Sequence, residues 1–101
     1  ATVPRRPDVP PDEFFRYWRE NHTGVVLSCL RDLRGYVQCP AVRLPGFTPE
    51  LDGCAIVWFD DVDTMRRIRR TPEWEALRAD ERNFIDQPNM IQVTGQEEQL
   101  L

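Results

Sequence analysis

His22 is the only histidine in the chain, and its side chain is the one best suited to proton transfer at neutral pH. An unperturbed imidazole titrates at about 6.5, so it exchanges protons near neutrality without special tuning. In a helix, His22 would share a face with Trp18 and lie close to Tyr17. A carboxylate such as Asp86 could orient the imidazole or hold a proton itself. We therefore expect His22 to act as general acid or base, with Tyr17 and Asp86 as catalytic partners, although a lone histidine at a helix end also commonly caps or packs.

Six further side chains are of types that bind a carbonyl compound or a flat ring. Tyrosine hydroxyls and side-chain amides donate hydrogen bonds to a carbonyl or enolate oxygen, the stabilisation that proton abstraction beside a carbonyl requires. Tryptophan and phenylalanine form apolar walls for a ring. Packing, or helix capping in the case of Asn83, would explain the same residues. The candidate substrate-binding residues are Trp18, Tyr36, Gln38, Trp58, Asn83 and Phe84.

Several other chemistries lack the residues that they need. The chain has no glycine pattern for a nucleotide, no GxSxG nucleophile and no second histidine to share a metal ion. Its cysteines, Cys29, Cys39 and Cys54, form no CxxC pair, and their odd number argues against a disulfide framework. We therefore expect no metal and no cofactor, and reduced cysteines.

The composition limits the classes of partner that we expect for this chain. The formal net charge is −4, the opposite of what a phosphate-binding surface needs, so we expect neither a nucleic-acid nor a membrane partner. The one basic cluster, within residues 66–70, is expected to be a solvated helix face. No apolar run approaches the roughly 18 residues of a membrane span, and no charged segment followed by an apolar one stands at the amino end. A cytoplasmic location is the resulting expectation.

Periodicity and turn residues predict an alternation of strands and helices within one domain of 101 residues. Pro11 suits a first helical position, and Thr71 with Pro72 suits the cap and first position of a later helix. Gly53–Phe59 is nearly all apolar and is expected to be a central strand covered on both faces. The predicted elements are a weak strand before Pro10, a helix from 11 that Gly35 ends, strands over 36–42 and 53–59, a helical region from 60 or 61 that breaks near 71–72 and ends before Phe84, and a strand over 89–96.

This order is the βαββαβ pattern of a ferredoxin-like α+β domain with a four-stranded antiparallel sheet. Helices on one face of such a sheet leave its other face bare, and the apolar ends of the tail, Leu100 and Leu101, also need cover. Two copies that pack sheet against sheet would provide it. We therefore expect a homodimer.

A series of short motifs runs along nearly the whole chain: Pro11-Asp12-Glu13-Phe14, Tyr17-Trp18, His22, Arg34-Gly35-Tyr36-Val37-Gln38, Asp52-Gly53, Trp58-Phe59 and Asn83-Phe84-Ile85-Asp86. In the order and spacing of these motifs, the chain resembles the EthD family of dimeric α+β-barrel proteins. The family usually has a hydrophobic first strand and a serine helix cap, whereas this chain has only Ala1 to Val3 before Pro4, and Pro10 at the cap.

The resemblance implies a homodimeric barrel with a pocket between each sheet and its helices. Members are associated with ether breakdown, lactone isomerisation, and dehydration or decarboxylation of polyketide intermediates. The favoured interpretation is a cofactor-independent lyase, isomerase or cyclase that moves protons on a hydrophobic aromatic or polyketide-like substrate. The alternatives are a non-catalytic binding or accessory protein for a hydrophobic metabolite, and a cofactor-free monooxygenase. Haem ligation by a histidine near a helix end occurs in related barrels and is a remaining alternative.

Overall fold

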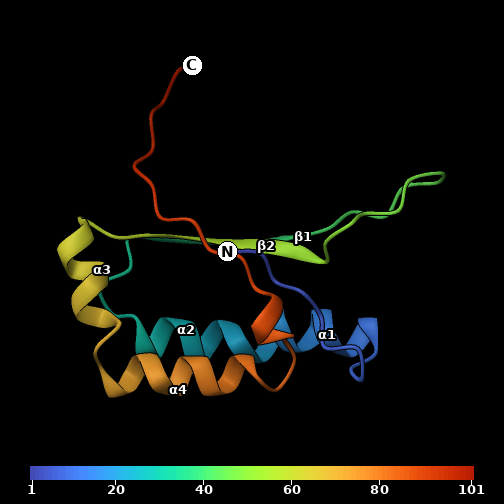
Figure 1. Ribbon diagram of the computed structural model, residues 1–101, viewed down its shortest axis with the longest axis horizontal. Coiled ribbons are helices and arrows are strands. Elements are labelled where there is room, and N and C mark those ends of the chain that lie inside the picture. Colours follow the sequence, from blue (N-terminus) through green and yellow to red (C-terminus); the bar gives the residue numbers. More distant parts are fainter.

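The computed structural model describes the whole chain, residues 1–101, as a sheet lying over a layer of helices (Figure 1). The predicted α+β class is confirmed, with a two-stranded antiparallel sheet. The strands are β1 (Gly35–Pro40) and β2 (Gly53–Trp58), and the helical elements are α1 (Pro11–Tyr17), η1 (Trp18–His22), α2 (Thr23–Cys29), α3 (Val62–Ile68), α4 (Pro72–Glu81) and η2 (Gln87–Asn89).

The first helical segment begins as predicted, with Pro11 at its first position and two acidic residues in its first turn. It then passes through η1, one wide turn of π-helix, before α2 continues to Cys29. The segment ends well before the predicted Gly35. Leu30 leaves the helical conformation, with φ −109° and ψ 72°, and its side chain is buried in the core. Burial of Leu30 therefore ends the helix before the glycine is reached.

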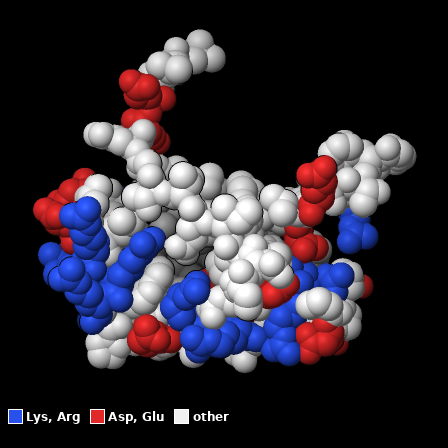
Figure 2. All heavy atoms as spheres, in the orientation of Figure 1, with Lys and Arg blue, Asp and Glu red and all other residues white.

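Helices α3 and α4 begin at side-chain caps. Asp61 accepts a hydrogen bond from the backbone N–H of Thr64, and Thr71 accepts one from that of Trp74, as its position before Pro72 predicts. Ile68 of α3 is buried, whereas Val62 at the start of the helix is half exposed. The exposed arginines of α3 form a basic face at one end of the molecule (Figure 2), as expected of a solvated helix surface.

The sheet is narrower than the predicted four strands. Beside β2, the amino-terminal segment forms two isolated bridges, Thr2 with Cys54 and Arg5 with Ile85, and Thr2 N–H donates to the carbonyl of Ile91 at 2.8 Å. The predicted strand over 89–96 does not form. Pro4 has no N–H and therefore interrupts the row of backbone donors in the amino-terminal segment, which pairs through isolated bridges and not as a regular strand.

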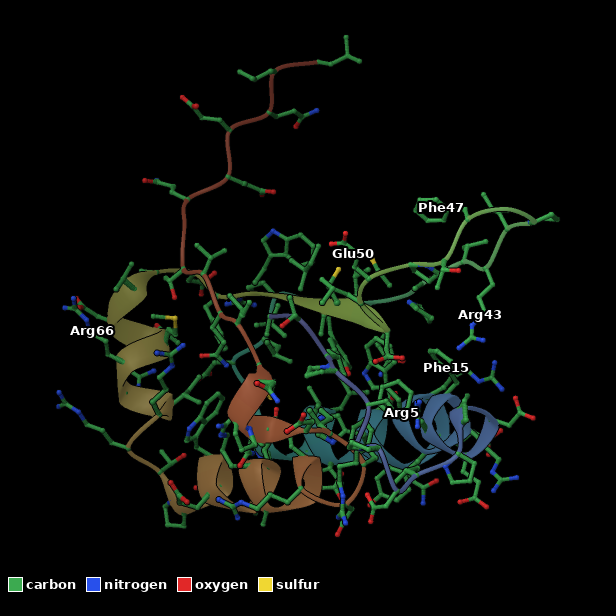
Figure 3. The ribbon with its side chains drawn as sticks, turned by 45° about the vertical axis from the view of Figure 1, so that its right-hand side comes forward. Arg5, Phe15, Arg43, Phe47, Glu50 and Arg66 are labelled. Carbon is green, nitrogen blue, oxygen red and sulfur yellow. The ribbon has the colours of Figure 1, made fainter.

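The two faces of the sheet differ in cover. Tyr36 and Gln38 point toward the helices, whereas Val37 and Ile56, paired across the strands, point away and are 41% and 43% exposed. The expectation that β2 is covered on both faces is therefore wrong for the single chain. Figure 1 shows the hairpin loop after β1 and the carboxyl-terminal tail projecting on this outer side. Phe47 and Glu50 lie on that loop, away from the helices (Figure 3).

The core consists of two clusters between the layers. One joins the amino-terminal segment to α1 and includes Phe14, Trp18 and Phe84; the other joins α2 to α3 and α4 through Val26 and Leu77. Because each cluster combines distant segments, the two clusters fix the helix layer beneath the sheet. No helix has the length and apolar character that crossing a membrane requires.

Candidate functional site

His22 lies at the end of η1 and is only 5% exposed. Its Nδ1 is 2.7 Å from Oδ2 of Asp80 on α4. Hydrogen bonds hold the π-helical turn η1 at the carbonyl of Trp18. This carbonyl accepts one hydrogen bond from Nε2 of Gln38 at 3.1 Å and one from Oγ1 of Thr23 at 3.3 Å. A strand side chain and a helix side chain thus fix the backbone from which the imidazole projects.

Asp80 is the centre of a hydrogen-bond network. Tyr17 donates its hydroxyl hydrogen to Oδ1 of Asp80 at 2.6 Å, and Nδ2 of Asn83 donates to the Tyr17 oxygen at 3.1 Å. Burial acts to raise the pKa of Asp80, but hydrogen bonds from Tyr17 and His22 outweigh it, so this pKa lies below its usual value. Burial, with the neighbouring carboxylate, raises the pKa of Tyr17. At neutral pH Asp80 is therefore ionised and Tyr17 is a neutral donor.

Asp80, and not Asp86, contacts His22. Asp86 begins η2, where its backbone N–H donates to the carbonyl of Pro4 and its Oδ2 accepts a hydrogen bond from Asn89. The relevant sequence signal was helical spacing, because Asp80 lies three residues after the core residue Leu77 and so near the inward face of α4.

A cavity of about 990 Å³ extends from the space between the sheet and the helices to the tail, where residues 92–97 border it, and most of its lining residues are hydrophobic. Of the predicted residues, His22, Trp18 and Tyr36 line it together, and Trp58 borders it beside the tail. Such a volume is sufficient for a bicyclic or larger organic molecule. The cavity therefore brings an imidazole into an apolar environment.

Three of the predicted binding residues lie outside the cavity, next to other predicted site residues. Phe84 is fully buried, and its ring centroid lies 5.0 Å from that of His22 and 5.0 Å from that of Tyr17. Gln38 donates to the hydroxyl oxygen of Tyr36 at 2.7 Å, while Asn83 is exposed and contacts Tyr17. None of the three lines the cavity, and each contacts another predicted site residue.

Trp58 lies on the other face of the sheet from Tyr36. Its ring packs over Gly35, where an added Cβ would approach to 2.9 Å, and its Nε1 donates to Oε2 of Glu97 in the tail at 3.2 Å. Because neighbouring strand positions alternate between faces, this ring cannot stack with Trp18 inside the two layers. Trp58 thus joins the tail to the outer face.

Sequence reasoning missed Glu81, a buried carboxylate that lines the same cavity. Its position one helical turn after Leu77 on α4 was the available signal, but isolated acidic residues are usually solvated. No group of three or more His, Cys, Asp or Glu side chains is arranged to hold a metal ion.

Comparison with known protein families gives one match: the model of the EthD domain fits residues 6–88. No curated protein and no solved structure matches the chain. The matched region includes both core clusters' helices, both strands and every residue of the network around His22. Because the match covers most of the chain, the protein belongs to the EthD family.

Proposed function

We propose that this protein is a cofactor-independent enzyme that moves protons on a small hydrophobic substrate, of aromatic or polyketide-like character. The reaction class is that of a lyase, isomerase or cyclase: dehydration, decarboxylation, isomerisation or ring closure. The single observation that carries this proposal is the state of His22, whose Nδ1 is held by Asp80 while the residue lines an apolar cavity.

The hydrogen bond to Asp80 determines which imidazole nitrogen faces the substrate. An ionised carboxylate only accepts hydrogen bonds, so Nδ1 carries the hydrogen and donates it to Asp80. In the neutral ring, Nε2 then holds the lone pair. No side chain of the protein hydrogen-bonds to Nε2, and it is not among the buried polar atoms sealed from solvent. Nε2 is therefore available as a base, and as an acid after protonation.

The surroundings of Nε2 favour catalysis over simple storage of a metabolite. A protein that only stores a metabolite needs an apolar cavity, and its histidine could equally well be exposed to solvent. Here the imidazole is buried and oriented by a carboxylate that Tyr17 holds in turn. Such an arrangement of base and orienting group supports acid–base chemistry. The binding-protein alternative retains support from the largely hydrophobic lining, and a cofactor-free monooxygenase would need the same cavity.

Exchange of a carbon-bound proton tests the proposal without knowledge of the natural substrate. We expect the wild-type protein to accelerate deuterium incorporation beside the carbonyl of 2-tetralone, a bicyclic aromatic ketone, in D₂O at neutral pH, followed by NMR. His22→Gln keeps a polar side chain but cannot transfer protons at neutral pH, so the rate should fall by roughly 10²- to 10⁴-fold.

The control is Glu20→Gln, a substitution of similar size at an exposed position of the same helical turn. It should leave the exchange rate unchanged. Equal rates for wild type and His22→Gln, with 2-tetralone shown to bind by calorimetry, would contradict the catalytic proposal and leave the binding-protein alternative ahead.

We also propose that the active form is a homodimer in which the sheets of the two protomers face each other and form a barrel. In the dimer, each sheet would gain further strands at its edges and become four-stranded. Support comes from the bare outer face, where Val37 and Ile56 are substantially exposed, and from the partial pairing of the amino-terminal segment with β2 and with Ile91. A stable interface of this kind should bury more than roughly 1,200 Å² in total.

A further inference from the structure

The cavity contains a second ionisable side chain, Glu81, on the last turn of α4. Glu81 is 6% exposed, which is unusual for a glutamate unless its charge is compensated. Its Oε1 accepts hydrogen bonds from Nη1 of Arg78 at 2.7 Å and from Nε2 of Gln87 at 3.1 Å. One carboxylate oxygen is thus fully occupied within the protein.

The second oxygen is not. Oε2 of Glu81 has no hydrogen-bond partner in the chain, and it is not among the buried polar atoms sealed from solvent. Since Glu81 is nearly buried and lines the cavity, the accessible surface of Oε2 faces that space. Tyr36, on β1, lines the same cavity. Burial raises the pKa of Tyr36, and the negative charge of Glu81 adds to this effect. Glu81 therefore presents charge toward β1 across the cavity.

The ion pair with Arg78 determines what this oxygen can bind. Glu81 forms an ion pair with Arg78, and a carboxylate in an ion pair is an acceptor only, with no hydrogen to donate. An unpaired acceptor among hydrophobic walls favours a ligand that brings a hydrogen-bond donor and disfavours one that brings a second negative charge. Discrimination by such a buried group exceeds what apolar contacts achieve.

We propose that Oε2 of Glu81 anchors the substrate, and that the substrate is a neutral hydrophobic molecule carrying a hydroxyl group, whereas carboxylates of the same size are rejected. This inference rests on the proposed function, because it names the class of substrate that would bind in the cavity lined by both His22 and Glu81. The hydroxyl donates to Glu81 on α4, and the reacting carbon lies toward His22 on η1.

Binding of three matched probes tests the inference on the full chain. The probes are 2-naphthol, which has a hydroxyl donor, 2-methoxynaphthalene, which has none, and 2-naphthoate, which is anionic. A hydrogen bond to a charged acceptor corresponds to roughly 10- to 100-fold in affinity. Calorimetry at neutral pH should show 2-naphthol binding tighter than 2-methoxynaphthalene by about that factor, with 2-naphthoate weakest. Equal affinities for the first two, or tightest binding of 2-naphthoate, would overturn the inference.

Variants assign the preference to Glu81. Glu81→Gln should reduce the advantage of 2-naphthol by about tenfold and strengthen 2-naphthoate binding by a similar factor. Glu75→Gln, at an exposed position of the same helix, should change neither. Should Glu81→Gln fail to fold, equal affinities on the wild type would still overturn the inference, and loss of the preference in His22→Gln would still assign the acceptor to His22 and overturn it.

Failure of this inference and failure of the catalytic proposal give different results. His22→Gln should keep the preference for 2-naphthol even though it abolishes proton exchange. A preference that survives in Glu81→Gln but disappears in His22→Gln would assign the acceptor to His22 and overturn the role of Glu81. Loss of proton exchange in His22→Gln supports catalysis whichever way the probe comparison comes out.

Discussion

The ring of Trp18 lies directly against the backbone of Gly53, where an added Cβ atom would approach two ring carbons to 2.9 Å. The same Cβ would lie 2.6 Å from the carbonyl oxygen of Cys39 on the neighbouring strand. Only a residue without a side chain allows η1 and β2 to approach this closely. Because Trp18 lines the cavity one turn before His22, this contact also sets the distance between the sheet and the candidate base.

Gly53→Ala should therefore destabilise the protein. One of the two clashes is with backbone, which cannot rotate away, so we expect a loss of about 1–3 kcal/mol in the free energy of unfolding. Urea denaturation measures this change. The matched control is Gly24→Ala, since an added Cβ at Gly24 meets nothing within 4 Å and the residue lies in α2. There, alanine should be neutral or stabilising by up to about 1 kcal/mol; equal effects at the two sites would contradict the close approach.

Asp80→Asn should remove an acid-dependent part of the stability. The pKa of Asp80 in the folded protein is lower than its ordinary value, so its contribution is fully present above the unfolded-state pKa of about 3.9. It is lost as the pH falls through the lower folded-state pKa. Asp80→Asn should be less stable by about 1–3 kcal/mol at pH 7 and lose less stability on acidification. Asp63→Asn, at a 92% exposed side chain, serves as control. Thermal unfolding followed from neutral to acidic pH would contradict the prediction if the difference from wild type stayed constant.

Tyr17→Phe separates positioning from proton transfer. Tyr17 contacts Asp80 and lies outside the cavity, so its loss removes one hydrogen bond to the carboxylate but leaves the contact between Asp80 and His22. We expect a loss of about 1–2 kcal/mol in stability and a decrease in 2-tetralone exchange of less than about tenfold, well below the effect of a lost acid–base group. A decrease as large as that of His22→Gln would instead show that Tyr17 takes part in the chemistry.

Ile56→Glu tests the homodimer. Ile56 points outward from the sheet, so a charge there would be buried between two facing sheets and should convert the dimer to a monomer. Sedimentation velocity at micromolar concentration reports the change. Leu27→Glu places the same charge at an exposed position of α2, in the helix layer on the opposite side of the sheet (Figure 1), and should leave the dimer intact. A wild-type protein that sediments as an 11.9 kDa monomer would remove the barrel proposal.

Local chemistry allowed the sequence to predict the starts of helices. The cap at Thr71, and the prolines at first helical positions, act within one turn and need no distant partner. The family resemblance was also readable, because spaced motifs persist in the linear order. The end of α2 was not readable, since burial of Leu30 against α3 and α4 overrides the signal of Gly35.

In the candidate site, too, some features could be predicted from the sequence and others depended on the tertiary structure. The residue type of His22 and its place on an inward helix face followed from the sequence, because only imidazole titrates near neutrality without tuning and helical spacing is regular. Its partners did not, because hydrogen bonds between η1 and α4 depend on how the two helices pack. Several inward carboxylates were possible from spacing alone, and only tertiary packing placed Asp80 behind the imidazole and Glu81 in the cavity. Trp58 was likewise assigned to a face by the register of β1 and β2, which a shift of one residue would have reversed.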